Sequence, residues 1–171
     1  KILEKTGKKN LHEVWPNFEL YMHGGINFEP YRKKFEELFP KGINYIESFN
    51  ASEGYFGIQD NPNKNDLLLM LDFGIYYEFI LLKNAHKNKP SVVSLSEVKQ
   101  GEDYEMVITT NAGLWRYRIG DTVRFTKVNP YRFVITGRTK HHLNVFGEEL
   151  MIHNAEKALQ KVCTDLQLEV L

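Results

Sequence analysis

The chain has 171 residues, 42% of them hydrophobic and 13% aromatic, and its 22 lysines and arginines balance 22 aspartates and glutamates. This composition excludes an intrinsically disordered chain, and the lack of a basic surplus argues against a nucleic-acid-binding surface. The single cysteine, Cys163, excludes an internal disulfide and a cysteine zinc cluster and favours an intracellular protein. No apolar run approaches the roughly 20 residues that cross a bilayer. Because the first residue is Lys rather than Met, we expect a piece of a longer protein.

The first fifty residues predict a strand, a helix and a second strand. A short helix around residues 11–14 should end before Pro16, because the residue before a proline avoids the helical conformation. Residues 18–22 are typical of a buried strand. Apolar side chains recur at helical spacing over residues 28–39, and residues 44–49 again resemble a strand. Together these elements indicate an α/β unit.

The middle of the chain predicts a mostly antiparallel sheet or a distorted barrel. Short β-prone runs alternate with turns rich in Gly, Asn, Pro or Lys. The polar segment 83–90 is typical of a solvated hairpin tip, and helical spacing returns over residues 147–167. The predicted fold class is therefore α/β (α+β), ending in a helix. The β-prone runs cover residues 67–71, 76–81, 92–95, 105–109, 122–127 and 132–136.

Two segments combine glycine with a carboxylate in the way a ligand site does. Residues 47–54 run from a strand end into small polar residues and Glu53, where a phosphate or ring can approach the backbone, although an ordinary turn is about as consistent with them. In residues 113–121, Asp121 follows Gly120 at an expected tight turn, where its carboxylate could accept hydrogen bonds from the vicinal diol of a ribose. Ordinary hairpin chemistry is the commoner explanation of such a dipeptide.

Two further segments are less specific. Residues 135–142 contain a Gly-Arg turn and a basic cluster, which fit either an anion site or a hinge between domains. Its adjacent histidines are a weak metal signal, because neighbours on a strand point to opposite faces. The glycine pair in residues 22–25 could line a pocket or only turn the chain. The usual signatures of P-loop nucleotide triphosphatases, serine hydrolases and zinc proteases are absent from the sequence.

Taken in order, these segments resemble the Gretchen Hagen 3 auxin-responsive family of acyl acid amido synthetases. That family lies within the adenylate-forming superfamily, together with acyl-CoA synthetases and firefly luciferase. Phe-Asn-Ala-Ser-Glu at residues 49–53 is similar to the family's second nucleotide motif, which usually reads Tyr-Ala-Ser-Ser-Glu in plant members. Tyr-Arg-Ile-Gly-Asp at residues 117–121 is similar to its third motif, and Gly-Arg-Thr-Lys at 137–140 resembles the superfamily's hinge. Tyr-Glu-Phe-Ile at 77–80 and Asn-Pro-Tyr-Arg at 129–132 resemble bacterial members.

The resemblance implies an ATP site with assigned residues. Phe49 would stack on the adenine, and the small residues after it would border the adenine and the α-phosphate. Asp121 would bind the ribose hydroxyls beside Tyr117, and Gly25 would line the nucleotide or acyl pocket. The bordering small residues are Asn50, Ala51 and Ser52.

The resemblance also implies a reaction. Such enzymes use ATP and Mg²⁺ to convert a carboxylic acid into an acyl-adenylate, and an amino acid then displaces AMP to give an amide. Glu53 would hold Mg²⁺ against the phosphates, Arg138 would assist at the ribose or α-phosphate, and Lys140 would be the hinge residue. The implied partners are small carboxylic acids and amino acids, with neither nucleic acid nor membrane, in the cytoplasm.

By this resemblance the chain is a fragment of the large N-terminal domain of an adenylate-forming enzyme. Residues 1–139 would be the later part of that domain, and residues 140–171 the hinge and the start of a C-terminal lid domain. No Ser/Thr/Gly-rich phosphate loop occurs in these residues, so we expect the isolated chain to be inactive. Two alternatives stay open: a non-catalytic binding or interaction module with the same fold, and an adenylate-forming enzyme with a different acceptor.

Overall fold

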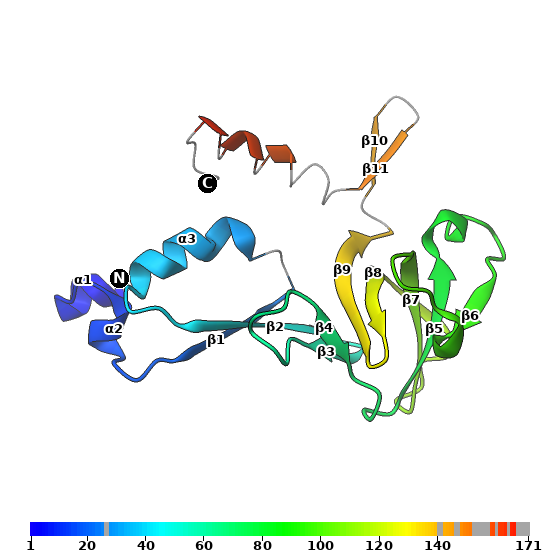
Figure 1. Cartoon of the computed structure of the whole chain (residues 1–171), viewed down its shortest axis with the longest axis horizontal. Coiled ribbons are helices and arrows are strands. Elements are labelled where there is room, and N and C mark those ends of the chain that lie inside the picture. Colours follow the sequence, from blue (N-terminus) through cyan, green and yellow to red (C-terminus); the bar gives the residue numbers. More distant parts are fainter. Residues whose placement is uncertain are drawn as a thin grey trace.

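The computed structural model describes residues 1–25, 28–139, 142–145, 148–151, 158–159, 161–163 and 165–166, with the backbone alone for residues 142–145 and 148–151. These residues form a nine-stranded mixed sheet, a two-stranded sheet and several short helices (Figure 1). The helices are α1 (Ile2–Thr6), α2 (Leu11–Val14) and α3 (Glu29–Leu38), with the 3-10 turns η1 (Leu82–Asn84) and η2 (Leu95–Glu97). The strands are β1 (Leu20–Gly24), β2 (Asn44–Ala51), β3 (Gly54–Ile58), β4 (Leu67–Leu69), β5 (Ile75–Leu81), β6 (Val92–Ser94), β7 (Asp103–Thr110), β8 (Tyr117–Val128), β9 (Tyr131–Arg138), β10 (His142–Val145) and β11 (Glu148–Met151).

The predicted strand-helix-strand unit is confirmed. β1 and β2 pair in parallel, from Leu20 opposite Asn44 to Gly24 opposite Ser48, and α3 connects them. Figure 1 shows α3 running along these two strands, and the ring of Phe35 lies 4.6 Å from that of Tyr21 on β1. β1 is half-buried and exposed in alternation, so the expectation of a buried strand was wrong. β1 is an edge strand of the described sheet, and a helix covers only one of its faces.

The rest of the large sheet is antiparallel, in the order β1-β2-β3-β4-β9-β8-β7-β5-β6. The described sheet is open, because β1 and β6 form its two edges. Of the two predicted arrangements, an antiparallel sheet and a distorted barrel, the described residues therefore form the first. Aromatic rings from β2, β3, β5, β8 and β9 fill one continuous core. Burial of these large rings removes the most apolar area per side chain from water and holds the curved sheet together. The core phenylalanines are Phe49, Phe56, Phe79, Phe125 and Phe133.

Two sequence expectations differ from the structure. β3 was not predicted, because its two glycines lower the local preference for a strand. Residues 148–151 pair with residues 142–145 as a hairpin, so the helix expected to begin at residue 147 was wrong there. The described residues 158–159, 161–163 and 165–166 are helical as expected. A short apolar run fits the start of a helix or a strand equally well, and here the pairing partner decides.

The close packing at Gly57 on β3 gives a first stability prediction. A Cβ atom there would lie 2.7 Å from Cζ of the fully buried Phe133 ring. We expect Gly57→Ala to lower the free energy of unfolding by about 1–3 kcal/mol, because overpacking forces the ring or the strand to move. Urea denaturation measures this. The double variant with Phe133→Leu should recover part of the Gly57→Ala loss, and an unchanged midpoint for Gly57→Ala alone would contradict the packing.

Candidate functional site

Asp121 lies in a bulge in the middle of β8. β8 is a continuous strand of 12 residues, so the tight turn expected at Gly120 was wrong. On the β7 side, Arg118 pairs with Val107 and Thr122 with Glu105, which leaves residues 119–121 opposite Met106 alone. Gly120 has φ +83°, a backbone conformation that L side chains rarely adopt. The extra residues of a β-bulge turn a side chain away from its regular direction, and here they set the direction of Asp121.

Asp121 and Arg138 form an ion pair between β8 and β9. The two residues are directly opposite in the sheet, and Arg138 Nε lies 2.7 Å from Asp121 Oδ1. The Asp121 side chain is 11% exposed, whereas that of Arg138 is 53% exposed. One residue further, the Thr139 backbone N–H donates to the Gly120 carbonyl oxygen at 2.7 Å. The structure therefore brings the third-motif segment and the hinge segment together; Lys140 lies outside the described residues.

The second-motif segment forms the hairpin between β2 and β3. Ala51 pairs with Gly54, and Ser52 and Glu53 form the turn between them. The turn interpretation is thus correct for the backbone, and it leaves Ser52 exposed and Glu53 half-buried at the tip. Asn50 is exposed on the last part of β2. Small and polar side chains at this tip leave room for a phosphate or a metal ion to approach.

The burial of Phe49 does not fit a stacking role. Its side chain is 6% exposed, and its ring packs 5.1 Å from that of Phe56 and 6.0 Å from that of Phe133. A ring that stacks on a base must present a face to it, and this ring has neighbours in the core instead. Tyr117, at the start of β8, is by contrast 42% exposed. Gly25 is exposed directly after β1.

Both segments are anchored in the same core. Phe49 and Ala51 from the hairpin pack in the aromatic cluster that also holds Ile119 from the bulge and Ile135 from β9. The hairpin tip and the Asp121–Arg138 pair are therefore supported by one packed interior. Rigid support of this kind is what a binding site needs in order to hold its polar groups in place.

A polar cluster under α3 was not found from the sequence. His23 lies opposite Glu47 across the parallel strands, and its ring stacks 4.4 Å from that of Phe28. In the described part of the chain, His23 Nδ1 and the Tyr45 hydroxyl are buried without a hydrogen-bond partner. Burial, and then the nearby Glu29 carboxylate, raise the pKa of Glu47, while burial and Arg32 lower the pKa of His23. The parallel register that assembles this cluster is a long-range property, so only the alternating strand pattern could have hinted at it.

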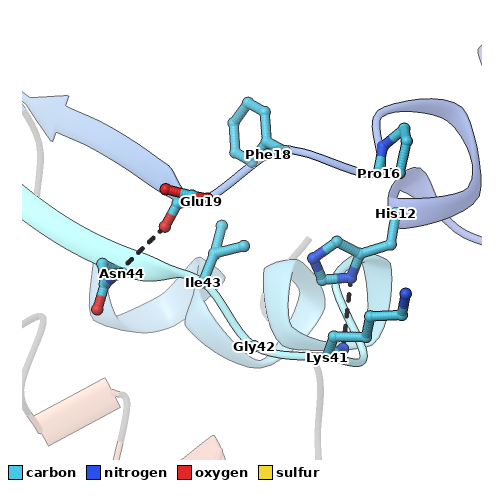
Figure 2. A pocket seen from close by; sticks show the side chains of 8 residues that line it. All are labelled: His12, Pro16, Phe18, Glu19, Lys41, Gly42, Ile43 and Asn44. Carbon is cyan, nitrogen blue, oxygen red and sulfur yellow. Dashed lines mark hydrogen bonds between the residues drawn. The ribbon is translucent and has the colours of Figure 1, made fainter.

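The surface also has a hollow of about 450 Å³ near the N-terminal end, away from both motif segments. Figure 2 shows His12 and Lys41 on one side of it and Phe18 and Glu19 on the other. The backbone N–H of Lys41 donates to His12 Nδ1 at 3.3 Å, which accounts for this buried histidine. None of the residues assigned to the nucleotide from sequence lines the hollow. The candidate site therefore consists of the Asp121–Arg138 pair on β8 and β9 and the hairpin tip, which pack on the same core.

The Glu53 carboxylate at the hairpin tip fits a magnesium ion that a bound nucleotide would also hold. Among the described residues, no group of three His, Cys, Asp or Glu side chains could hold a metal ion by itself. Mg²⁺ seldom uses such an all-protein cage and is usually held by one or two carboxylates together with substrate phosphates. The half-buried Glu53 at the hairpin tip is a carboxylate of this kind. No helix in the described part of the chain is long and apolar enough to span a membrane.

Two sequence patterns of one protein family match this chain. The sequence pattern of the GH3 family central domain matches residues 68–138, and that of the GH3 family N-terminal domain matches residues 1–43. The chain belongs to the GH3 family.

Individual relatives agree with this assignment. The jasmonoyl-L-amino acid synthetase JAR4 of Nicotiana attenuata is 33% identical over 93% of this chain and 29% of its own length. The indole-3-acetic acid-amido synthetase GH3.15 of Arabidopsis thaliana is 35% identical over 64% of this chain and 20% of its length. The solved structure of the GH3.15 acyl acid amido synthetase superposes with a TM-score of 0.73 at 27% identity, over 92% of this chain and 28% of that one. The chain thus spans about three tenths of the length of the relatives that it matches most fully.

Proposed function

We propose that this chain is part of an ATP-dependent ligase that joins a small carboxylic acid to an amino acid through an amide bond. The observation that carries the proposal is membership of a family whose relatives include the jasmonoyl-L-amino acid synthetase JAR4 and the indole-3-acetic acid-amido synthetase GH3.15. A solved structure of GH3.15 with 2,4-DB shows that this relative binds a small molecule. The charged pair on β8 and β9 and the hairpin tip would supply part of the nucleotide site.

The proposed reaction has two steps. A carboxylate oxygen of the acid attacks the α-phosphorus of ATP, the bond to the β-phosphate oxygen breaks, and pyrophosphate leaves. The amine nitrogen of the amino acid then attacks the acyl carbon of the acyl-adenylate, AMP leaves with the electron pair of the broken C–O bond, and the nitrogen loses a proton. Both steps gain from positive charge near the phosphates, where negative charge develops.

The β8–β9 pair would hold the nucleoside end of ATP. Asp121 would accept hydrogen bonds from the ribose hydroxyls, because a carboxylate accepts two donors and the bulge sets its direction. Arg138 neutralises this carboxylate and is half-exposed, so its guanidinium can also meet the ribose or the α-phosphate. Tyr117 lies four residues before Asp121 on the same strand and would border the nucleotide.

The hairpin tip would hold the phosphate end. Glu53 would bind Mg²⁺ against the phosphates, where the ion supplies charge neutralisation. The small residues Asn50, Ala51 and Ser52 would border the α-phosphate, and Gly25 would line the pocket. Because Phe49 is buried, we leave it out of the nucleotide contacts and assign it to the core that supports this hairpin.

The domain division follows the same proposal. Residues 1–139 would belong to the large adenylation domain, with Lys140 at the hinge and residues 140–171 at the start of a lid. A single cysteine is consistent with a cytoplasmic protein, and small carboxylic acids and amino acids would be its only substrates beside ATP.

The test uses the protein in its full natural length with ATP, Mg²⁺ and a panel of carboxylic and amino acids. Acid-dependent exchange of labelled pyrophosphate into ATP reports the first step, and mass spectrometry of the amide reports the second. Exchange with amide formation supports the ligase. Exchange with no amide, but with transfer to a thiol, would make it an adenylate-forming enzyme with another acceptor. If calorimetry detects binding of AMP but no pyrophosphate exchange occurs, the protein would be a non-catalytic binding module.

Glu53→Gln tests the proposed metal contact. The amide keeps the size of the carboxylate but loses its charge, so we expect the Mg²⁺ concentration for half-maximal exchange to rise about tenfold, with one charged contact worth about 1.5 kcal/mol. Titration of Mg²⁺ at saturating ATP measures this. Glu102→Gln, at an exposed position directly before β7 and outside the hairpin, is the matched control and should leave the titration unchanged. Equal Mg²⁺ titration curves for Glu53→Gln and the wild-type protein would show that Glu53 does not bind the metal ion.

A further inference from the structure

An ion pair between a buried carboxylate and a partly exposed arginine bridges the bulge that carries Asp121. Glu105 on β7 is 1% exposed, and Arg118 on β8 donates from Nε to Glu105 Oε1 at 2.9 Å and from Nη2 to Oε2. The same Nη2 also donates to the carbonyl oxygen of Ala85 at 2.8 Å. A carboxylate this deeply buried must be paired, and the hydrogen bonds from Arg118 account for the raised pKa of the arginine.

The position of the pair relative to the bulge is its distinctive feature. Arg118 is the last residue of β8 in register before the bulge, and Glu105 pairs with Thr122, the first residue in register after it. The ion pair therefore connects the two ends of the three-residue bulge 119–121 diagonally. A shift of the bulge along β7 would pull Arg118 away from Glu105 and leave a buried charge without its partner.

A second ion pair on the same two strands shows the ordinary arrangement. Arg124 and Asp103 are directly opposite, with Nη2 2.6 Å from Oδ2, and both are partly exposed. This pair crosses no irregularity of the β7–β8 ladder. Exposed pairs of this kind contribute little to stability, whereas a pair that takes a carboxylate such as Glu105 out of water is costly to form. A costly pair across a bulge thus suggests a need for a fixed bulge geometry.

We propose that Arg118 and Glu105 are positioning residues that fix the 119–121 bulge, and through it hold the Asp121 carboxylate at the nucleotide. This inference rests on the proposed role of Asp121. Arg118 lies in the motif segment 117–121 but has no place among the proposed nucleotide contacts: its side chain donates to Glu105 and to the carbonyl oxygen of Ala85. Its effect on the reaction would therefore pass through the backbone of the bulge.

The first measurement is steady-state kinetics of the full-length protein with Arg118→Lys. Lysine keeps a positive charge beside Glu105 but cannot make the bidentate hydrogen bonds of arginine. The bulge should therefore become less fixed, while the buried Glu105 carboxylate keeps a charged partner. We expect KM for ATP to rise about tenfold, a loss of about 1.4 kcal/mol, with kcat and KM for the carboxylic acid within twofold. Arg124→Lys is the matched control and should leave all three unchanged. An unchanged KM for ATP in folded Arg118→Lys would overturn the inference.

A double-mutant comparison separates positioning from a general effect on folding. If Arg118 acts through Asp121, adding Arg118→Lys to Asp121→Asn should raise KM for ATP no further, whereas independent effects would multiply. Multiplying effects overturn the inference and leave the role of Asp121 intact. An Asp121→Asn variant that binds ATP normally would instead overturn the proposed role of Asp121 itself.

A spectroscopic readout does not depend on activity. The backbone amide resonances of Gly120 and Asp121 should move in Arg118→Lys and stay in place in Arg124→Lys. If Arg118→Lys does not fold, Glu105→Gln is the second variant, because it keeps the shape of the Glu105 side chain. The Arg118 side chain is 40% exposed, so its charge stays in contact with water in that variant. Unmoved resonances in the folded variant would show that the pair does not hold the bulge.

Discussion

Asp121→Asn is expected to raise KM for ATP in the full-length protein by about 10- to 100-fold. The change keeps the shape of the side chain but removes the charge that pairs with Arg138 and that, in the proposed site, would accept hydrogen bonds from the ribose. Hydrogen bonds to a charged group contribute about 1.5–3 kcal/mol, and each 1.4 kcal/mol corresponds to tenfold. Steady-state kinetics at saturating carboxylic acid, together with calorimetric titration of AMP, measure the effect.

Asp103→Asn provides the control for Asp121→Asn. It removes a carboxylate of the same kind from an arginine pair on neighbouring strands, but outside the bulge. Asp103→Asn should leave KM for ATP within twofold of the unchanged protein. Equal effects of the two substitutions would mean that Asp121 acts through general electrostatics or stability, and the ribose contact would have to be abandoned.

Arg132→Met is expected to lower the free energy of unfolding at pH 7 by about 3 kcal/mol, because it leaves carboxylates at a partly buried site without their partner. The Arg132 side chain is 7% exposed. Its Nε lies 2.8 Å from Asp66 Oδ1, and its other nitrogens bind Asp60. Thr126 on β8 donates to the second oxygen of Asp66, so the network joins β8 and β9 to the segment before β4. Urea denaturation at pH 7 measures the loss.

The same network predicts a pH dependence. Hydrogen bonds from Arg132 lower the pKa of Asp60; burial alone would raise the pKa of Asp66, but hydrogen bonds from Arg132 and Thr126 outweigh it and lower it. A carboxyl with a lowered pKa stabilises the fold fully above its unfolded pKa of about 4, and this stabilisation is lost as the pH falls through the lower folded pKa. The difference between Arg132→Met and the unchanged protein should therefore shrink below about pH 4.

The exposed Arg124 again offers a comparison. Arg124→Met on β8 should change the free energy of unfolding by less than about 1 kcal/mol both at pH 7 and at pH 3, because exposed ion pairs contribute little. A loss from Arg132→Met that stays constant between pH 7 and pH 3 would show that packing of the arginine stem, not its charge, stabilises this part of the sheet.

The sequence predicts those elements whose signal is local. The spacing of Phe28 and Phe35 predicts α3, and the apolar runs on either side predict β1 and β2, all of which the structure confirms. Tyr31, at the same apparent spacing, is exposed. Tyr31 is exposed because a helix of ten residues buries only a narrow stripe of side chains against two strands.

The details of the site depend on partners distant in sequence. A Gly-Asp pair is typical of a turn, and only the pairing of β8 with β7 and β9 turns it into a bulge. The ion pair of Asp121 with Arg138 joins residues that two strands bring into register, although the motifs had already indicated both residues. Phe49 marks the opposite case: its motif position implies contact with a base, but core rings from β3 and β9 pack against it and bury it.

The contact between Thr139 and Gly120 sets a limit on where the chain can turn. Both the backbone N–H and the hydroxyl of Thr139 donate to the Gly120 carbonyl oxygen, at 2.7 and 3.2 Å. Any rotation of the segment that follows must then pivot beyond Thr139, because a pivot before it would break both bonds. If the residues downstream form the proposed lid, Arg138 would therefore keep its place beside Asp121 in every orientation of that lid, and the proposed nucleoside contact would not depend on the lid's position.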